Sequence, residues 1–171
     1  MQTSTPTTAR LLASPQLSKS IWAALAGSML LLGVAAGQRS APVAHLLAPG
    51  AVEAPAHGTA AAVFTVTIDS GFHIQSNHPK LSYLIPTAIS ITPAGGVAAV
   101  RVNWPPTVDR KFNFAPDALA VFEGTVKIPV TLRTGGPGTQ VLHGTFQYQA
   151  CNDRVCRAPE TVPFTLQVHI R

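Results

Sequence analysis

The sequence predicts an all-β domain built from short antiparallel strands. Charged residues make up only 11% of the chain, and the helix-forming residues Glu, Lys and Gln are sparse after its N-terminal segment. Several segments alternate apolar with polar side chains, as strands with one buried face do. Turn-forming glycine and proline interrupt these segments about every ten residues. About seven short strands spaced in this way indicate an immunoglobulin-like antiparallel β-sandwich.

The N-terminal segment, residues 1–37, has the order of residues that is typical of an export signal. Arg10 and Lys19 precede a long apolar run that ends in small residues. One interpretation is a signal peptide that is cleaved after these small residues. The other is an uncleaved membrane anchor through residues 21–37, although the apolar run is slightly shorter than the roughly 18–20 residues that span a bilayer comfortably. Both interpretations place the domain in the periplasm or another extracytoplasmic space, where a disulfide persists.

The domain itself is expected at residues 61–171. Residues 38–60 are rich in Ala, Pro and Gly and predict a linker with one strand near residues 43–47. The segments 72–86 and 109–116 are expected to be loops. Pro129 indicates an edge strand or a bulge, because proline cannot donate a hydrogen bond to a neighbouring strand. The expected strands are residues 63–68, 87–92, 97–102, 119–122, 125–132, 141–151 and 161–170.

The charge pattern and the histidines argue against several classes of function. The formal charge of +5 falls to +3 once Arg10 and Lys19 of the leader are left out. The remaining basic residues form no run or stripe, so we expect no nucleic acid partner. His73, His78 and His143 are too scattered to predict a metal site. The sequence lacks the GxSxG motif of many hydrolases, so hydrolase chemistry is not expected. We expect no cofactor.

The only two cysteines, Cys151 and Cys156, lie close together near the C-terminal end. Alternation along the preceding strand groups Tyr148 with Ala150 on an apolar face. Cys151 therefore falls on the opposite, polar face, where we expect a partner to reach it. The residues between the cysteines favour a turn, so their Cα atoms can lie within the roughly 4.4–6.8 Å that a disulfide needs.

Spacing alone leaves two roles open for this pair. Closing a ring of roughly six residues stabilises a domain by about 2 kcal/mol, against about 4.7 kcal/mol for a hundred-residue loop. A short ring on an outward face therefore favours chemistry over stability. Arg154 and Arg157 would favour a thiolate, whereas Asp153 would oppose it. A redox-active pair and a structural disulfide both remain consistent with these residues.

The flanks of the cysteine pair carry a recognisable pattern. The segments concerned are Tyr148-Gln149-Ala150-Cys151, Cys156-Arg157-Ala158-Pro159-Glu160-Thr161, Gly71-Phe72-His73-Ile74, Ser76-Asn77-His78-Pro79, Leu84-Ile85-Pro86-Thr87 and Ile128-Pro129-Val130-Thr131. Together they resemble the N-terminal periplasmic domain of the thiol:disulfide interchange protein DsbD. The resemblance extends over residues 43–170 and implies an immunoglobulin-like sandwich whose cysteine pair shuttles electrons.

The resemblance also implies partners and roles. In that family, the domain receives electrons from a membrane-embedded thiol domain through a thioredoxin-like domain. It passes them to periplasmic disulfide isomerases and to thioredoxins of cytochrome maturation. Carried over, Cys156 forms the mixed disulfide with the partner and Cys151 resolves it. Phe112 or Phe114 corresponds to an aromatic cap that shields the pair.

The chain also departs from the family pattern. Arg157 stands where an aromatic residue often follows the second cysteine, and Ala150 where a glycine often precedes the first. The sequence includes neither a multi-span membrane domain nor a thioredoxin-like domain, so its electron donor would be another protein. Two functions are therefore expected. One is a thiol:disulfide oxidoreductase that works with a membrane thiol donor and thioredoxin-like envelope proteins. The other is a non-catalytic envelope binding module with a structural disulfide.

Overall fold

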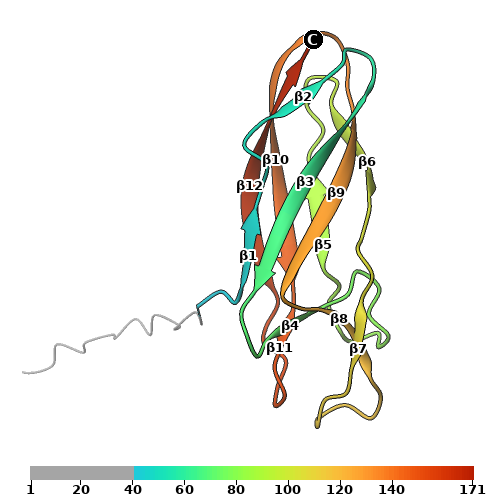
Figure 1. Ribbon diagram of the computed structural model, residues 1–171, viewed down its shortest axis with the longest axis vertical. Coiled ribbons are helices and arrows are strands. Elements are labelled where there is room, and N and C mark those ends of the chain that lie inside the picture. The colour runs from blue at the N-terminus through green and yellow to red at the C-terminus, as the bar shows by residue number, and fades with distance from the viewer. Residues whose placement is uncertain (1–40) are drawn as a thin grey trace, which may run out of the picture. The chain divides into compact units, whose positions relative to one another are not determined.

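The computed structural model describes residues 41–171, so the expected leader lies outside the described residues. Residues 41–171 form three four-stranded sheets and contain no helix (Figure 1). The first sheet has the strand order β1 (Ala44–Leu47), β3 (Thr59–Ile68), β9 (Thr125–Arg133), β6 (Ala98–Val102). The second has the order β2 (Val52–Ala54), β12 (Glu160–Ile170), β10 (Gly138–Tyr148), β5 (Ala88–Ile91). The third has the order β11 (Ala150–Cys151), β4 (His73–Gln75), β8 (Leu119–Phe122), β7 (Val108–Arg110).

The first two sheets pack face to face and enclose the main core. Figure 1 shows the sheet of β3 and β9 in front of the sheet of β10 and β12. Phe64 and Ile128 from the first sheet and Phe146 and Leu166 from the second belong to one buried cluster. Every strand pair in these sheets is antiparallel except β2 with β12. The prediction of an all-β sandwich is therefore confirmed.

The segment that was expected to be a linker is part of the sandwich. Within residues 41–60, β1 pairs with β3, and β2 pairs with β12. Val43, Ala44, Val52 and Ala54 are buried against the main core, and burial of these small apolar side chains holds both strands in place. The segment 38–60 as a whole is rich in Ala and Pro, and β2 has only three residues, so the sequence showed no alternation there.

The prediction that Pro129 marks an edge strand is wrong. Its strand, β9, lies between β3 and β6. The last residue pair between β6 and β9 is Val102 with Val130, and the Asn103 backbone N–H donates to the Pro129 carbonyl at 2.8 Å. Because the nitrogen and the carbonyl of a strand residue face the same neighbour, the Pro129 nitrogen lies just beyond the end of β6. Pro129 has no N–H to return a hydrogen bond to the Asn103 carbonyl, so the ladder between β6 and β9 ends at this pair. The bulge lies in β6, between Ala99 and Arg101.

The third sheet lies at the lower end of the sandwich in Figure 1. It has buried side chains on both faces. All four residues of β8 are buried. Phe122 belongs to the main core, whereas Leu119 and Val121 face a second, smaller cluster. We call this second cluster the cap cluster. Its buried members are Leu84, Phe112, Ala115, Leu119 and Val121.

Tyr148 anchors the end of β10, just before the cysteine hairpin. Its side chain is fully buried, and its ring stacks on Phe146 with the centroids 5.3 Å apart. Burial, together with the carboxylate of Glu160 in the neighbouring strand, raises the pKa of Tyr148 to about 12. The phenol therefore stays neutral and serves as a core ring.

Candidate functional site

The two cysteines form a disulfide across a narrow hairpin. Cys151, in β11, and Cys156 are directly opposite each other and are joined with an S–S distance of 2.01 Å. Beside them, the Arg157 backbone N–H donates to the Ala150 carbonyl at 2.7 Å. The cysteines thus occupy a non-hydrogen-bonded position, where antiparallel strands approach most closely. Their Cα atoms are 3.9 Å apart, which is closer than the sequence-based expectation.

The turn between the cysteines is fixed by Asn152. Its backbone N–H donates to the Val155 carbonyl at 3.0 Å. Its side-chain Oδ1 accepts hydrogen bonds from the backbone N–H groups of Arg154, at 2.9 Å, and Val155, at 3.0 Å. Asparagine forms such turns readily because its short side chain can mimic a backbone carbonyl. The turn expected between the cysteines is therefore confirmed.

Cys151 is fully buried, so the prediction that it is exposed is wrong. The predicted phase was correct, because Ala150 faces the main core and Cys151 faces away from it. After Tyr148, however, the chain leaves the second sheet, and Cys151 pairs with His73 of β4. Cys151 and His73 share one face of the third sheet, and the cap cluster packs on that face through Phe112. Cys156 is half-buried and packs against the cap cluster, so it is the more accessible of the two sulfurs.

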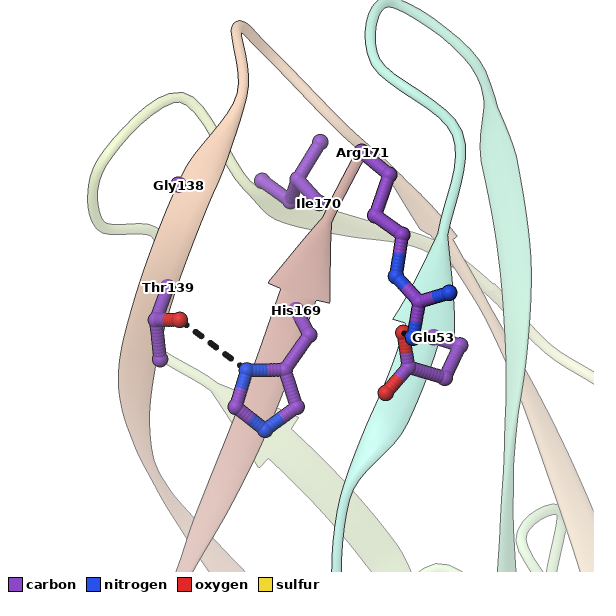
Figure 2. A pocket seen from close by; sticks show the side chains of 6 residues that line it. All are labelled: Glu53, Gly138, Thr139, His169, Ile170 and Arg171. Atoms are coloured by element: carbon purple, nitrogen blue, oxygen red, sulfur yellow. Dashed lines mark hydrogen bonds and ion pairs between the residues drawn. The ribbon is translucent and has the colours of Figure 1, made fainter.

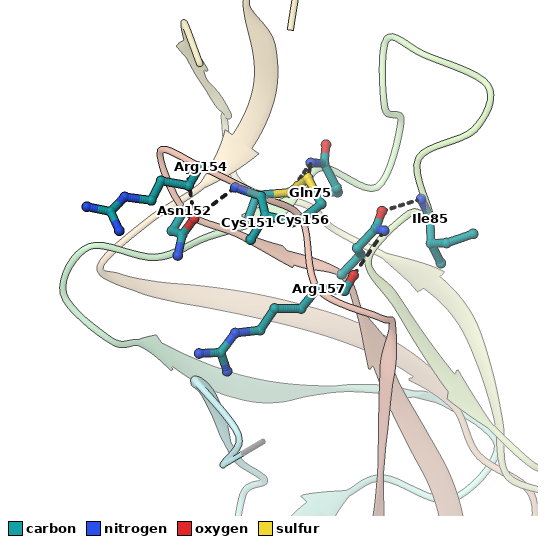
Figure 3. The surroundings of a disulfide bond; sticks show 9 residues. Gln75, Ile85, Cys151, Asn152, Arg154, Cys156 and Arg157 are labelled. Atoms are coloured by element: carbon teal, nitrogen blue, oxygen red, sulfur yellow. Dashed lines mark hydrogen bonds between the residues drawn. A yellow bond between two sulfur atoms is a disulfide. The ribbon is translucent and has the colours of Figure 1, made fainter. Parts of the chain in front are cut away.

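A buried amide lies beside the disulfide. The Gln75 Nε2 is 3.1 Å from Cys151 Sγ and 4.0 Å from Cys156 Sγ (Figure 3). Gln75 is fully buried, and its Oε1 has no hydrogen-bond partner among residues 41–171. Its backbone is held on both sides, since the N–H donates to the Gln149 carbonyl at 3.0 Å and the carbonyl accepts from Thr87 Oγ1. Sequence reasoning missed Gln75, because three-residue β4 lies in a segment that was expected to be a loop.

The hairpin is also tied to the neighbouring loop, residues 76–87. Gln149 bridges the two, since its Oε1 accepts from the Ile85 N–H at 2.9 Å and its Nε2 donates to the Arg157 carbonyl at 3.2 Å. The Arg157 guanidinium lies 4.4 Å from the Phe72 ring centroid and donates to the Ala41 carbonyl at 3.0 Å. The side chains of Arg154 and Arg157 point away from the sulfurs in Figure 3, so neither arginine supplies the thiolate stabilisation that the sequence suggested.

The two candidate cap residues occupy different positions. Phe112 is only 2% exposed, and its ring meets that of His73 edge-on with the centroids 5.3 Å apart. Phe114 is 41% exposed and stacks on Phe112 at 5.2 Å. Phe112 thus lies in the cap cluster against which Cys156 packs, and Phe114 covers Phe112 from the outside.

Polar contacts anchor the segment between β7 and β8, residues 111–118, which carries Phe112 and Phe114 and which we call the cap loop. Arg110, at the end of β7, makes two hydrogen bonds to the Glu123 carboxylate, at 2.8 and 2.9 Å. Glu123 also pairs with His73 Nε2 at 3.3 Å. These contacts connect the β7 end of the cap loop, through Glu123, to β4 next to the disulfide. No three His, Cys, Asp or Glu side chains within residues 41–171 come together as a metal site.

A surface groove lies at the opposite end of β10 and β12 from the disulfide (Figure 2). Its volume is about 390 Å³. Thr139 and His169 form a hydrogen bond at 2.9 Å, and Arg171 pairs with Glu53 at 2.7 Å. These two contacts join the polar side chains that line the groove in pairs.

Fold and site together define a class of protein, namely an immunoglobulin-like sandwich that carries a disulfide beside a small apolar cluster. Residues 44–167 match the family described as the N-terminal domain of thiol:disulfide interchange protein DsbD. The chain belongs to this family. As the family name implies for its members, it carries a close cysteine pair. The homologous domains of DsbD are periplasmic.

Solved structures provide further comparisons. The N-terminal periplasmic domain of ScsB from Proteus mirabilis is 18% identical with a TM-score of 0.55, and the match covers 78% of this chain and 50% of that one. The chain thus spans half the length of that protein chain. The DsbD N-terminal domain of Neisseria meningitidis, in the reduced form, is 14% identical with a TM-score of 0.43, covering 68% of this chain and 82% of that one. No curated protein sequence matches the chain. Residues 41–171 contain no helix that could cross a membrane.

Proposed function

We propose that Cys151 and Cys156 pass an electron pair from a membrane thiol donor to thioredoxin-like proteins of the envelope. The disulfide in the Cys151–Cys156 hairpin is the observation that carries this proposal. One of its sulfurs is half-buried at the cap cluster, and the other is fully buried. Together with membership of the DsbD N-terminal family, this asymmetry suits a pair in which one sulfur meets partners and the other does not.

The exchange proceeds in two steps, each of which breaks one S–S bond and forms another. The Cys156 thiolate attacks a sulfur of the partner's disulfide, and the other partner sulfur leaves as a thiolate. Cys151 then loses its proton and attacks Cys156 Sγ in the mixed disulfide, which releases the second partner sulfur. The two protons of the domain's dithiol end on the partner, which gains the electron pair. The domain becomes the disulfide, and a membrane dithiol donor returns it to the dithiol form by the reverse sequence.

The difference in burial supports these roles within the pair. Because Cys156 is half-buried and Cys151 is fully buried, a partner sulfur reaches Cys156 first. The buried Cys151 is directly opposite Cys156, which suits it to the resolving attack. Phe112 shields the pair from small thiols until a partner displaces the cap loop.

The burial of Cys151 also favours a second candidate function, a non-catalytic envelope binding module with a structural disulfide. A sulfur that is 0% exposed is typical of an inert bond. The short ring argues against a purely structural role, because closing it stabilises the domain by only about 2 kcal/mol.

Electron transfer to a partner tests the proposed function directly. The full-length chain is reduced, freed of reductant and mixed with an oxidised thioredoxin-fold protein, and the thiols on each protein are counted after alkylation. We expect each domain molecule to reduce one partner disulfide. The variant with both Cys151→Ala and Cys156→Ala serves as the control and should leave the partner oxidised. A reduced domain that is no better than this control would exclude the exchange function.

A further inference from the structure

The Gln75 side chain directs its donor at the buried end of the sulfur pair, and its acceptor is buried beside it on the far side (Figure 3). Its Nε2 is 3.1 Å from Cys151 Sγ, and its Oε1 is buried without a partner. An unpaired buried acceptor is unfavourable, and native structures seldom keep one without a reason. In the disulfide form neither sulfur carries a hydrogen, whereas in the dithiol form each S–H is a donor. Reduction therefore creates a hydrogen-bond donor next to the side chain that carries this unpaired acceptor.

Strand geometry places Gln75 on the same face as Cys151. Side chains two residues apart in a strand share a face, so Gln75 and His73 lie together. His73 is the direct partner of Cys151 in the ladder. On the opposite face, Ile74 belongs to the main core. The Gln75 amide therefore lies on the same face of the third sheet as Cys151.

We propose that Gln75 is a positioning residue that stabilises whichever protonation state Cys151 adopts during exchange, a role that rests on the proposed function. When a donor thiolate attacks Cys156 Sγ, the Cys151–Cys156 bond breaks and Cys151 leaves with the electron pair as a thiolate. The Gln75 Nε2–H donates to this thiolate, and a hydrogen bond to an ionised acceptor is stronger than one to a neutral sulfur. Once a proton from the donor's second thiol reaches Cys151, the Gln75 amide turns about its Cγ–Cδ bond and the new S–H donates to Oε1.

A neutral amide suits this position better than an ionisable group. Cys151 is fully buried, and burial without a hydrogen-bond donor disfavours a thiolate. The other titratable groups on this face are Cys156 and His73, whose Nε2 pairs with Glu123. The guanidinium groups of Arg154 and Arg157 point away from the sulfurs. Gln75 is therefore the group within hydrogen-bonding distance of Cys151 Sγ that can offset the cost of its ionisation.

The test measures thiolate formation at Cys151 as a function of pH. In the full-length chain with Cys156→Ser, Cys151 is the only thiol, and ultraviolet absorbance reports its thiolate without requiring access by a reagent. We expect Gln75→Met to move the midpoint to higher pH and to reduce the thiolate fraction about tenfold at a fixed pH below the midpoint. Gln149→Met is the matched control, because it also removes two hydrogen bonds of a glutamine beside the hairpin but none to sulfur. Its midpoint should not move.

The outcomes separate this inference from the proposed function. An unchanged midpoint in Gln75→Met would overturn the role of Gln75, even if the domain exchanges thiols normally. A raised midpoint in a domain that fails to reduce its partner would support the hydrogen bond and refute the exchange function. If Gln75→Met does not fold, Gln75→Asn is measured instead, because it withdraws the amide from the sulfur by one methylene. A raised midpoint of Cys151 ionisation would support the role of Gln75, and an unchanged midpoint would overturn it.

Discussion

Replacing Cys156 with serine abolishes mixed-disulfide formation with a thioredoxin-fold partner, whereas replacing Cys151 with serine makes the mixed disulfide accumulate. Cys156 is the half-buried sulfur, and Cys151 is buried opposite it. Without Cys156, a partner finds no sulfur within reach. Without Cys151, no thiolate resolves the intermediate, so most of the domain should remain linked to the partner.

The measurement uses a partner whose single active-site cysteine carries a thionitrobenzoate leaving group. Release of the coloured thiolate gives the rate, and mass spectrometry of the intact complex identifies the linked cysteine. The variant without either cysteine gives the background. Undiminished trapping through Cys151 in Cys156→Ser would contradict the assignment of roles that we infer from burial.

Replacing Phe112 with alanine should lower the free energy of unfolding by about 3–5 kcal/mol, as truncation of a buried phenylalanine does. Phe112 is 2% exposed, belongs to the cap cluster, and contacts the rings of both His73 and Phe114. Its loss should also open the cap over Cys156 and accelerate reduction of the disulfide by glutathione. Urea unfolding measures the first effect, and thiol release under native conditions measures the second.

Two controls separate shielding from stability. Phe114 is 41% exposed, so Phe114→Ala should have smaller effects on both measurements. Phe64 is fully buried in the main core, outside the cap cluster. Phe64→Ala should thus destabilise the domain comparably without accelerating reduction under native conditions. If Phe112→Ala and Phe64→Ala are reduced equally fast, the cap does not shield the disulfide.

The sequence predicted the long strands well because their alternation extends over enough residues. In β3, Phe64, Val66 and Ile68 are buried as expected, and Ile128, Val130 and Leu132 follow the same rule in β9. The strands that build the site have two to four residues. Over such lengths alternation is a weak signal, so β4 and β7 fall at segments where loops are expected, although β8 and β11 lie within expected strands.

The environment of the cysteines depended on contacts that are distant in sequence. Alternation gave the correct face for Cys151, but it could not reveal that Phe112 and its neighbours cover that face. Gln75 had no sequence signal at all, because a lone glutamine between Ile74 and Ser76 belongs to no recognisable motif. Its importance comes only from the pairing of β4 with β11 and β8, which brings the amide to the sulfurs.

The reduction potential of the Cys151–Cys156 pair tests the central claim most directly. The full-length chain is equilibrated in glutathione and dithiothreitol buffers, and the fraction of dithiol is determined by alkylation. An exchange module should have a potential between about −120 and −270 mV, the range of proteins that pass electrons through a disulfide. A pair that stays oxidised until well below about −300 mV, as structural disulfides in secreted proteins do, would contradict the claim and leave a binding module with a stabilising bond.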